Sequence, residues 1–176
     1  IIMASHANGE WLELMPELER VVRDAGRIIL ENWDKPRQIK HKGRIDLVTD
    51  TDVAVENSLL ESLSRLLPDA DFLAEESSAQ QELGELTWVI DPLDGTTNFA
   101  HKIPAIATSI GLWHNGSIVA GMIYNPIWDE CFHAVRSKGA FFNGQTMSVS
   151  KAATLEESVI ATGFPYAFQD HAEQIS

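Results

Sequence analysis

The chain has 176 residues, 44% of them hydrophobic, and a formal net charge of −13. This length suits one compact domain with its own core and is short for two ordinary domains. The 26 Asp and Glu residues against 13 Lys and Arg argue against a nucleic-acid-binding surface, because phosphate backbones are bound by clustered basic side chains.

The first residues show no targeting signal. Residues 1–9 lack the basic start and apolar stretch of a secretory signal, and no apolar run approaches the ~20 residues needed to cross a bilayer. Because Ile1 and Ile2 precede Met3, we expect residues 1–9 to be an added or flexible segment. We therefore expect one domain over residues 10–176, in the cytoplasm and without membrane contact.

Two amphipathic helices are predicted in the first part of the chain. From residue 10 to residue 33 apolar residues recur at three- and four-residue steps, which predicts a helix with one face in the core. A second helix is predicted from about residue 53 to residue 67, and Pro68 ends it. We expect this helix to pack through its leucines, which are Leu59, Leu60, Leu63, Leu66 and Leu67.

Short β-prone runs follow Pro68. They lie at residues 71–74, 87–90, 106–113, 118–124, 130–135 and 147–150. Asn115-Gly116 and Asn143-Gly144 are two-residue hairpin signals, because both central positions of a type I′ turn need a positive φ. The single cysteine, Cys131, has apolar surroundings and is expected to be a buried structural thiol. The pattern predicts an antiparallel meander with both helices on one face, an α+β layered architecture.

The most informative segment is WVIDPLDGTTNF, at residues 88–99. Pro92 lacks a backbone donor, so we expect the strand to stop at Asp91 and to leave Asp91 and Asp94 on a tight loop. Two carboxylates and the carbonyl of Leu93 between them are hard oxygen ligands, which suit Mg²⁺. The alternative is an Asp-rich turn whose side chains satisfy their own backbone.

The residues after Asp94 favour an anion. Gly95 lets the backbone turn closely, and the three residues after it are typical of the opening of a helix. The free amides of Gly95 and Thr96 would then point at one spot, which suits a phosphate group.

Two further acidic segments lie earlier in the chain. Glu75 ends a β-prone run, so it is predicted at the same end of the sheet as Asp91, unless it belongs to a solvated pair with Glu76. Asp52 lies at the start of the second helix, where Asp50, Thr51 or Asp52 would serve as an N-cap. Asp52 can also face the acidic site.

The order and separation of three motifs resemble those of the inositol monophosphatases: DLVTDTD (46–52), AEES (74–77) and WVIDPLDGTTNF (88–99). The likeness continues through GAFFNGQ (139–145) and ATGFP (161–165). It implies the layered α/β/α/β/α sandwich that the family shares with fructose bisphosphatases. It also implies a Mg²⁺-dependent phosphomonoesterase acting on inositol monophosphate or a similar small sugar or polyol phosphate.

Carried over position by position, the resemblance implies a set of two or three Mg²⁺ ions. Glu75, Asp91 and the Leu93 carbonyl would hold the first ion, and Asp91 would bridge to a second ion held with Asp94. Lys42 stands near the position of a family lysine close to the metals, with a solvated lysine as the alternative.

The resemblance also implies catalytic roles. Thr96, hydrogen-bonded to Asp52, would orient and deprotonate a water that attacks phosphorus in line, and Glu75 would take part through the first ion. The residues implied to bind substrate are Glu75, Leu93, Asp94, Gly95 and Thr96.

Other readings remain open. Phosphatases of 3′-phosphoadenosine 5′-phosphate and of fructose 1,6-bisphosphate belong to the same superfamily, although the former usually carry Lys-Glu where this chain has Thr97-Asn98. We expect residues 10–176 to be the N-terminal, metal-binding part of the family's domain, without its C-terminal part. A non-catalytic metal-binding scaffold is therefore an alternative of another class. Family members are commonly dimers, so the resemblance implies a homodimer.

Overall fold

The structure is a computed structural model that describes residues 10–35, 39–41, 47–77 and 82–161. Helices α1 (Glu10–Glu13), α2 (Met15–Asn32) and α3 (Asp50–Leu66) form the first part of the fold. They confirm the two expected helices, with an interruption at Leu14 and an earlier start at Asp50 for the second. The expectations for residues 1–9, for Lys42 and for residues 162–165 fall outside the described residues.

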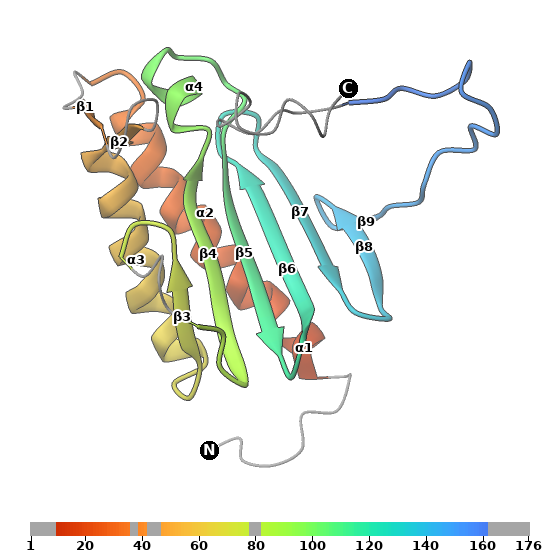
Figure 1. Ribbon diagram of the computed structural model, residues 1–176, viewed down its shortest axis with the longest axis horizontal. Coiled ribbons are helices and arrows are strands. Elements are labelled where there is room, and N and C mark those ends of the chain that lie inside the picture. Colours follow the sequence, from red (N-terminus) through yellow and green to blue (C-terminus); the bar gives the residue numbers. More distant parts are fainter. Residues whose placement is uncertain (1–9, 36–38, 42–46, 78–81, 162–176) are drawn as a thin grey trace, which may run out of the picture.

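Within the described residues, seven strands form one sheet, in the order β3-β4-β5-β6-β7-β8-β9 (Figure 1). Their bounds are β3 Asp71–Ala74, β4 Leu86–Asp94, β5 Ala107–His114, β6 Ser117–Asn125, β7 Glu130–Val135, β8 Gly139–Phe142 and β9 Gln145–Thr146. From β4 to β9 each strand pairs antiparallel with the next one along the chain, which confirms the meander. A separate antiparallel pair joins β1 (Ile39–His41) and β2 (Leu47–Thr49), which the sequence pattern did not predict.

Both predicted hairpin turns are present. Asn115 and Gly116, between β5 and β6, have φ values of 46° and 88°, and Asn143 and Gly144, between β8 and β9, have 45° and 77°. Positive φ at both central positions is what a type I′ turn requires. The strand expected at residues 147–150 is wrong, because the second hairpin places its returning strand directly after Gly144 and the ladder ends with the Met147 amide bonded to the Ala140 carbonyl (2.8 Å).

The first pair of the sheet is parallel, which the expected meander did not include. Residues 71–74 of β3 pair in parallel with residues 87–90 of β4. The segment between these strands, residues 75–85, is long enough to return to the other end of the sheet, whereas a tight hairpin would reverse the chain. As a result, the chain leaves β3 at the same end of the sheet at which β4 finishes.

The expectation that the strand stops before Pro92 is also wrong. β4 continues through Pro92 to Asp94, with a register shift in its pairing to β5 between Asp91 and Asp94. The pairing with β3 ends at Ile90, so β4 has a strand neighbour on one side only at this point. Proline is tolerated at such edge and bulge positions, because no ladder bond needs its missing N–H.

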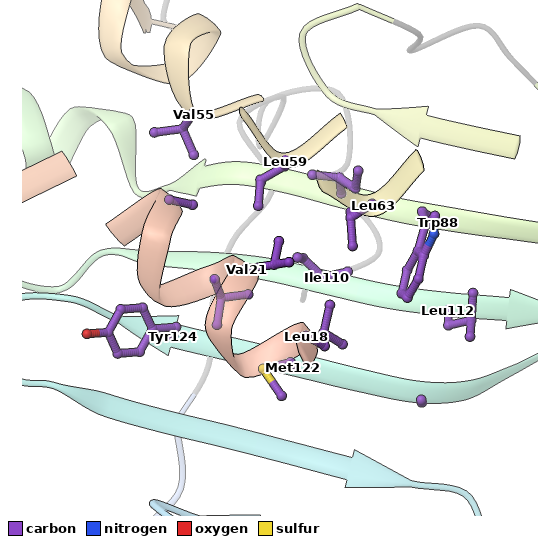
Figure 2. Close-up of a cluster of buried hydrophobic side chains, with 14 of the residues drawn as sticks. Leu18, Val21, Val55, Leu59, Leu63, Trp88, Ile110, Leu112, Met122 and Tyr124 are labelled. Carbon is purple, nitrogen blue, oxygen red and sulfur yellow. The ribbon is translucent and has the colours of Figure 1, made fainter. Parts of the chain in front are cut away.

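The core lies between the two long helices and one face of the sheet. Figure 2 shows their side chains meeting there: Leu18 and Val21 from α2, Val55, Leu59 and Leu63 from α3, and Trp88, Ile110, Leu112, Met122 and Tyr124 from the strands. The expected leucines of α3 are all in or against this core. Cys131 is 1% exposed and its burial raises the pKa of the thiol to about 11, which confirms a structural role.

The opposite face of the sheet is apolar. Gly111, Gly121 and the side chains of Ile118, Ile123 and Met147 border a depression of about 730 Å³ on this face. The three side chains are 43–50% exposed. No helix in the described part of the chain has the length and apolar character of a membrane-spanning segment.

Candidate active site

The candidate site lies where β3 and β4 end and where α3 and α4 (Thr96–Ala100) begin (Figure 1). The parallel register pairs Ala74 with Ile90, so Glu75, directly after β3, lies beside Asp91 of β4. The Glu75 amide donates to the Ile90 carbonyl at 3.2 Å and extends the ladder by one bond. Two of the expected site residues are therefore neighbours although 16 positions separate them in the sequence.

Asp91 is the most perturbed acid of the site. Burial, and then the neighbouring charges of Glu75 and Asp94, raise the pKa of Asp91 to about 7, and a hydrogen bond with Glu75 acts in the same direction. The Leu93 amide donates to Asp91 Oδ1 at 3.1 Å and opposes the shift. Near neutral pH the Asp91 carboxyl therefore retains its proton for part of the time, and a divalent cation would take the place of that proton.

A bulge lies at the end of β4, between Asp91 and Asp94. The Thr108 hydroxyl, on β5, donates to the Pro92 carbonyl at 2.9 Å, and the side chain of Leu93 is buried. The Leu93 carbonyl lies 3.2 Å from the Thr96 hydroxyl oxygen, as a second acceptor within reach of the single hydroxyl proton. The register shift thus holds Asp91, Asp94 and the Leu93 carbonyl on one short, well-connected segment.

Thr96 links this segment to α3. Its hydroxyl lies 2.9 Å from Asp52 Oδ1, and Asp52 is 1% exposed. Asp52 is the third residue of α3 and lies inside the helix's first turn. A buried carboxylate on a threonine hydroxyl can accept a proton from it or hold its oxygen in a fixed orientation.

Gly95 occupies a backbone position that other residues fill poorly. Its φ is 89°, and a Cβ there would lie 2.9 Å from the Ala105 carbonyl. The chain turns at this glycine and α4 starts at Thr96, as the sequence indicated. The amides at the start of α4 precede the first intrahelical bond, which runs from the Phe99 amide to the Gly95 carbonyl at 2.9 Å.

The donor atoms fit a hard divalent cation. Glu75, Asp91, Asp94 and the Leu93 carbonyl offer oxygen atoms only, which Mg²⁺ and Ca²⁺ prefer. Over residues 10–35, 39–41, 47–77 and 82–161, no three His, Cys, Asp or Glu side chains already form a metal-binding group. The Glu75–Asp91 pair is the part of the metal site that is already assembled. Further ligands would be a backbone oxygen, water or the Asp94 carboxylate after a small movement.

Sequence reasoning missed two residues that support the site. Glu56 is 3% exposed and accepts a hydrogen bond from the Glu76 amide at 2.9 Å, and Thr108, fully buried, holds the bulge. A signal for Glu56 existed: it is an acidic residue four positions after Asp52, on the same face of α3 as the apolar stripe.

Comparison with known proteins identifies the family of this chain. The model of the inositol monophosphatase family matches residues 11–175. The chain is 44% identical to an inositol monophosphatase of Dictyostelium discoideum, over 85% of this chain and 57% of that protein. It is also 44% identical to an inositol-1-monophosphatase of Synechocystis, over 89% of this chain and 54% of that protein.

Among solved structures, the extragenic suppressor protein suhB of Bartonella henselae superposes with a TM-score of 0.84 at 40% identity, over 93% of this chain and 64% of that chain. The chain spans a little over half the length of the curated relatives it matches. The match of the family model over nearly the whole chain, together with these identities, establishes that the chain belongs to the inositol monophosphatase family.

Proposed function

We propose that the protein is a Mg²⁺-dependent phosphomonoesterase that hydrolyses inositol monophosphate or a similar small sugar or polyol phosphate. Family membership supports the reaction class. The observation that carries the proposal is the meeting of the Glu75–Asp91 pair with the Thr96–Asp52 pair at one end of the sheet. We also propose that the protein acts in the cytoplasm as a homodimer, without nucleic acid or membrane, and that residues 10–176 form the metal-binding part of the domain.

We assign the metal ligands by donor type and position. Glu75, Asp91 and the Leu93 carbonyl would hold a first Mg²⁺ ion, and Asp91 with Asp94 a second, in a set of two or three ions. Bound Mg²⁺ would lower the pKa of a coordinated water and neutralise charge on the phosphoryl group. Asp91 is the ligand that the family resemblance implies for two ions, and the charges of both Glu75 and Asp94 act on it.

Thr96 and Asp52 would handle the proton of the attacking water. The Thr96 hydroxyl donates to Asp52 Oδ1, which leaves a lone pair of the threonine oxygen free to accept from water. As the water oxygen bonds to phosphorus and the ester P–O bond breaks, the water proton would pass to Thr96 Oγ1 while the threonine proton passes to Asp52, and the departing alkoxide would take a proton from solvent water. Substrate phosphate would contact Asp94 and the amides of Gly95 and Thr96, beside the oxygen atoms of Glu75 and Leu93.

The test measures phosphate release by the natural gene product, with the 176-residue chain in parallel. The substrates tested are inositol 1-phosphate, fructose 1,6-bisphosphate, 3′-phosphoadenosine 5′-phosphate and 2′-AMP. The last is included because a structural relative at 27% identity is described as 2′-AMP-bound SaIMPase-II. We expect release from the inositol phosphate that needs Mg²⁺ and stops with EDTA. Mg²⁺ binding without turnover of any substrate would favour the non-catalytic scaffold and reject the proposed activity.

A further inference from the structure

Helix α3 presents two buried carboxylates one turn apart. Asp52 and Glu56 are 1% and 3% exposed, and residues four positions apart lie on the same face of a helix. Asp52 accepts the Thr96 hydroxyl at 2.9 Å, and Glu56 Oε2 accepts the backbone amide of Glu76 at 2.9 Å. One face of α3 is therefore bonded to both chain segments that build the candidate site.

The Glu56 contact acts on the backbone that carries Glu75. The Glu75 amide is bonded to the Ile90 carbonyl of β4 at 3.2 Å, and the next amide, that of Glu76, is bonded to Glu56. The strand β3 has already ended at Ala74, so the sheet no longer fixes the chain beyond Glu75. The two bonds together set the direction in which the Glu75 side chain leaves the backbone.

A purely structural role is a poor explanation of Glu56. Its neighbours on the same face of α3, Val55 and Leu59, are fully buried in the core. Burial of a carboxylate costs free energy unless hydrogen bonds compensate, and an apolar side chain of similar size often serves stability equally well or better at such a position. The buried glutamate is better explained by the hydrogen bond that its Oε2 accepts from the Glu76 amide.

We propose that Glu56 is a positioning residue for the metal site: by accepting the Glu76 amide, it fixes the backbone of Glu75 and thereby the Glu75–Asp91 pair. This inference rests on the proposed assignment of Glu75 and Asp91 as metal ligands. It extends that assignment to a residue on another element of the fold, which contacts neither metal nor substrate itself.

The test compares two substitutions in the natural gene product. Glu56→Gln keeps a carbonyl oxygen at the same reach, whereas Glu56→Met has a similar length and no comparable acceptor. A control, Leu63→Ala, removes a fully buried side chain of the same helix, seven residues and about two turns beyond Glu56. Mg²⁺ affinity is measured by calorimetry, stability by urea unfolding, and exchange of the Glu76 amide in metal-free protein by NMR.

We expect Glu56→Met to weaken Mg²⁺ binding about 10-fold or more, the usual effect of losing a partner that orients a ligand, and to speed exchange of the Glu76 amide. It should unfold at a urea concentration close to that of the wild type. Glu56→Gln should stay within about threefold of wild-type affinity, and Leu63→Ala should lose stability while the folded molecules keep their affinity. If Glu56→Met does not fold, Glu56→Ala receives the same measurements.

The outcomes separate this inference from the proposed function. Wild-type protein that binds no Mg²⁺ rejects the proposed function and this inference with it. Wild-type binding that Glu56→Met leaves unchanged rejects the positioning role alone. Equal losses of affinity in Glu56→Gln and Glu56→Met, or an equal loss in Leu63→Ala, would also overturn it, because the effect would then follow charge or general stability and not the hydrogen-bond acceptor.

Discussion

Replacing Asp91 by asparagine should stabilise the metal-free protein and abolish most of its Mg²⁺ binding. The pKa of Asp91 is raised from 3.8 to about 7, by burial first and then by Glu75 and Asp94. The folded state therefore holds this proton more tightly than the unfolded state does. The stabilising contribution of the protonated Asp91 carboxyl is fully present below about pH 4. It is lost as the pH rises toward 7, because the folded protein must then carry a poorly solvated charge.

The size of the effect follows from the shift. A shift of about three units at 1.36 kcal/mol each sets an upper limit of about 4 kcal/mol. Because the side chain is only partly buried, solvent screening reduces the expected effect to about 1–2 kcal/mol. Asp91→Asn removes the charge and nearly preserves the shape, so the metal-free variant should exceed the wild type by this amount at pH 8 and by little at pH 4.

The assay is urea unfolding followed by far-UV circular dichroism at pH 4, 6 and 8, in EDTA and again in Mg²⁺. At Mg²⁺ concentrations above the dissociation constant, the free energy of unfolding of the wild type should rise with the logarithm of the Mg²⁺ concentration. That of Asp91→Asn should stay nearly unchanged. Asp94→Asn is the graded control, because Asp94 is exposed and is the weaker charge acting on Asp91. A variant that is less stable than wild type in EDTA at pH 8, or that keeps wild-type metal affinity, would refute the reasoning.

Three further substitutions test other parts of the structure. In the natural gene product, Thr96→Ala should lower kcat about 100-fold or more with little change in KM, because it removes the hydroxyl bonded to Asp52 and keeps the amide. Thr96→Ser should retain activity, and a change confined to KM would mean that Thr96 only contacts phosphate. Gly26→Ala should lower the melting temperature although alanine favours helices, because its Cβ would lie 2.5 Å from the Tyr124 ring. We expect the free energy of unfolding to fall by about 1–3 kcal/mol, and a higher melting temperature would contradict this packing. Ile123→Lys should reduce the fluorescence of bound anilinonaphthalene sulfonate, since this side chain is 46% exposed on the apolar face of the sheet. The free energy of unfolding should change by less than about 0.5 kcal/mol. Unchanged fluorescence would show that the dye binds elsewhere.

Local features of the sequence predicted most secondary structure. The three- and four-residue spacing of apolar side chains predicted α2 and α3, because a helix needs a continuous apolar stripe to dock on a sheet. The two Asn-Gly pairs located both hairpins, because few other residues accept positive φ at two successive positions. The acidic motifs likewise singled out Glu75 and Asp91, which the structure places side by side.

Some interactions between distant segments escaped this reasoning. The parallel pairing of β3 with β4 joins residues 16 positions apart in the chain, and no periodicity within either strand encodes its direction. Pro92 was expected to end β4, because the local rule concerns a missing donor; the fold supplies an edge and a bulge where no donor is needed.

The burial of single polar groups was also decided only in three dimensions. By position alone Asp52 fitted a helix cap that could also face the acidic site, and its bond to Thr96 was implied only by the resemblance, whereas Glu56 had no predicted role. Packing α3 against the sheet removes both side chains from water and brings them to the Thr96 hydroxyl and the Glu76 amide. Sequence therefore determined which residues carry oxygen ligands, whereas tertiary structure determined which of them are buried, since the partner of a buried carboxylate comes from a segment remote in the chain.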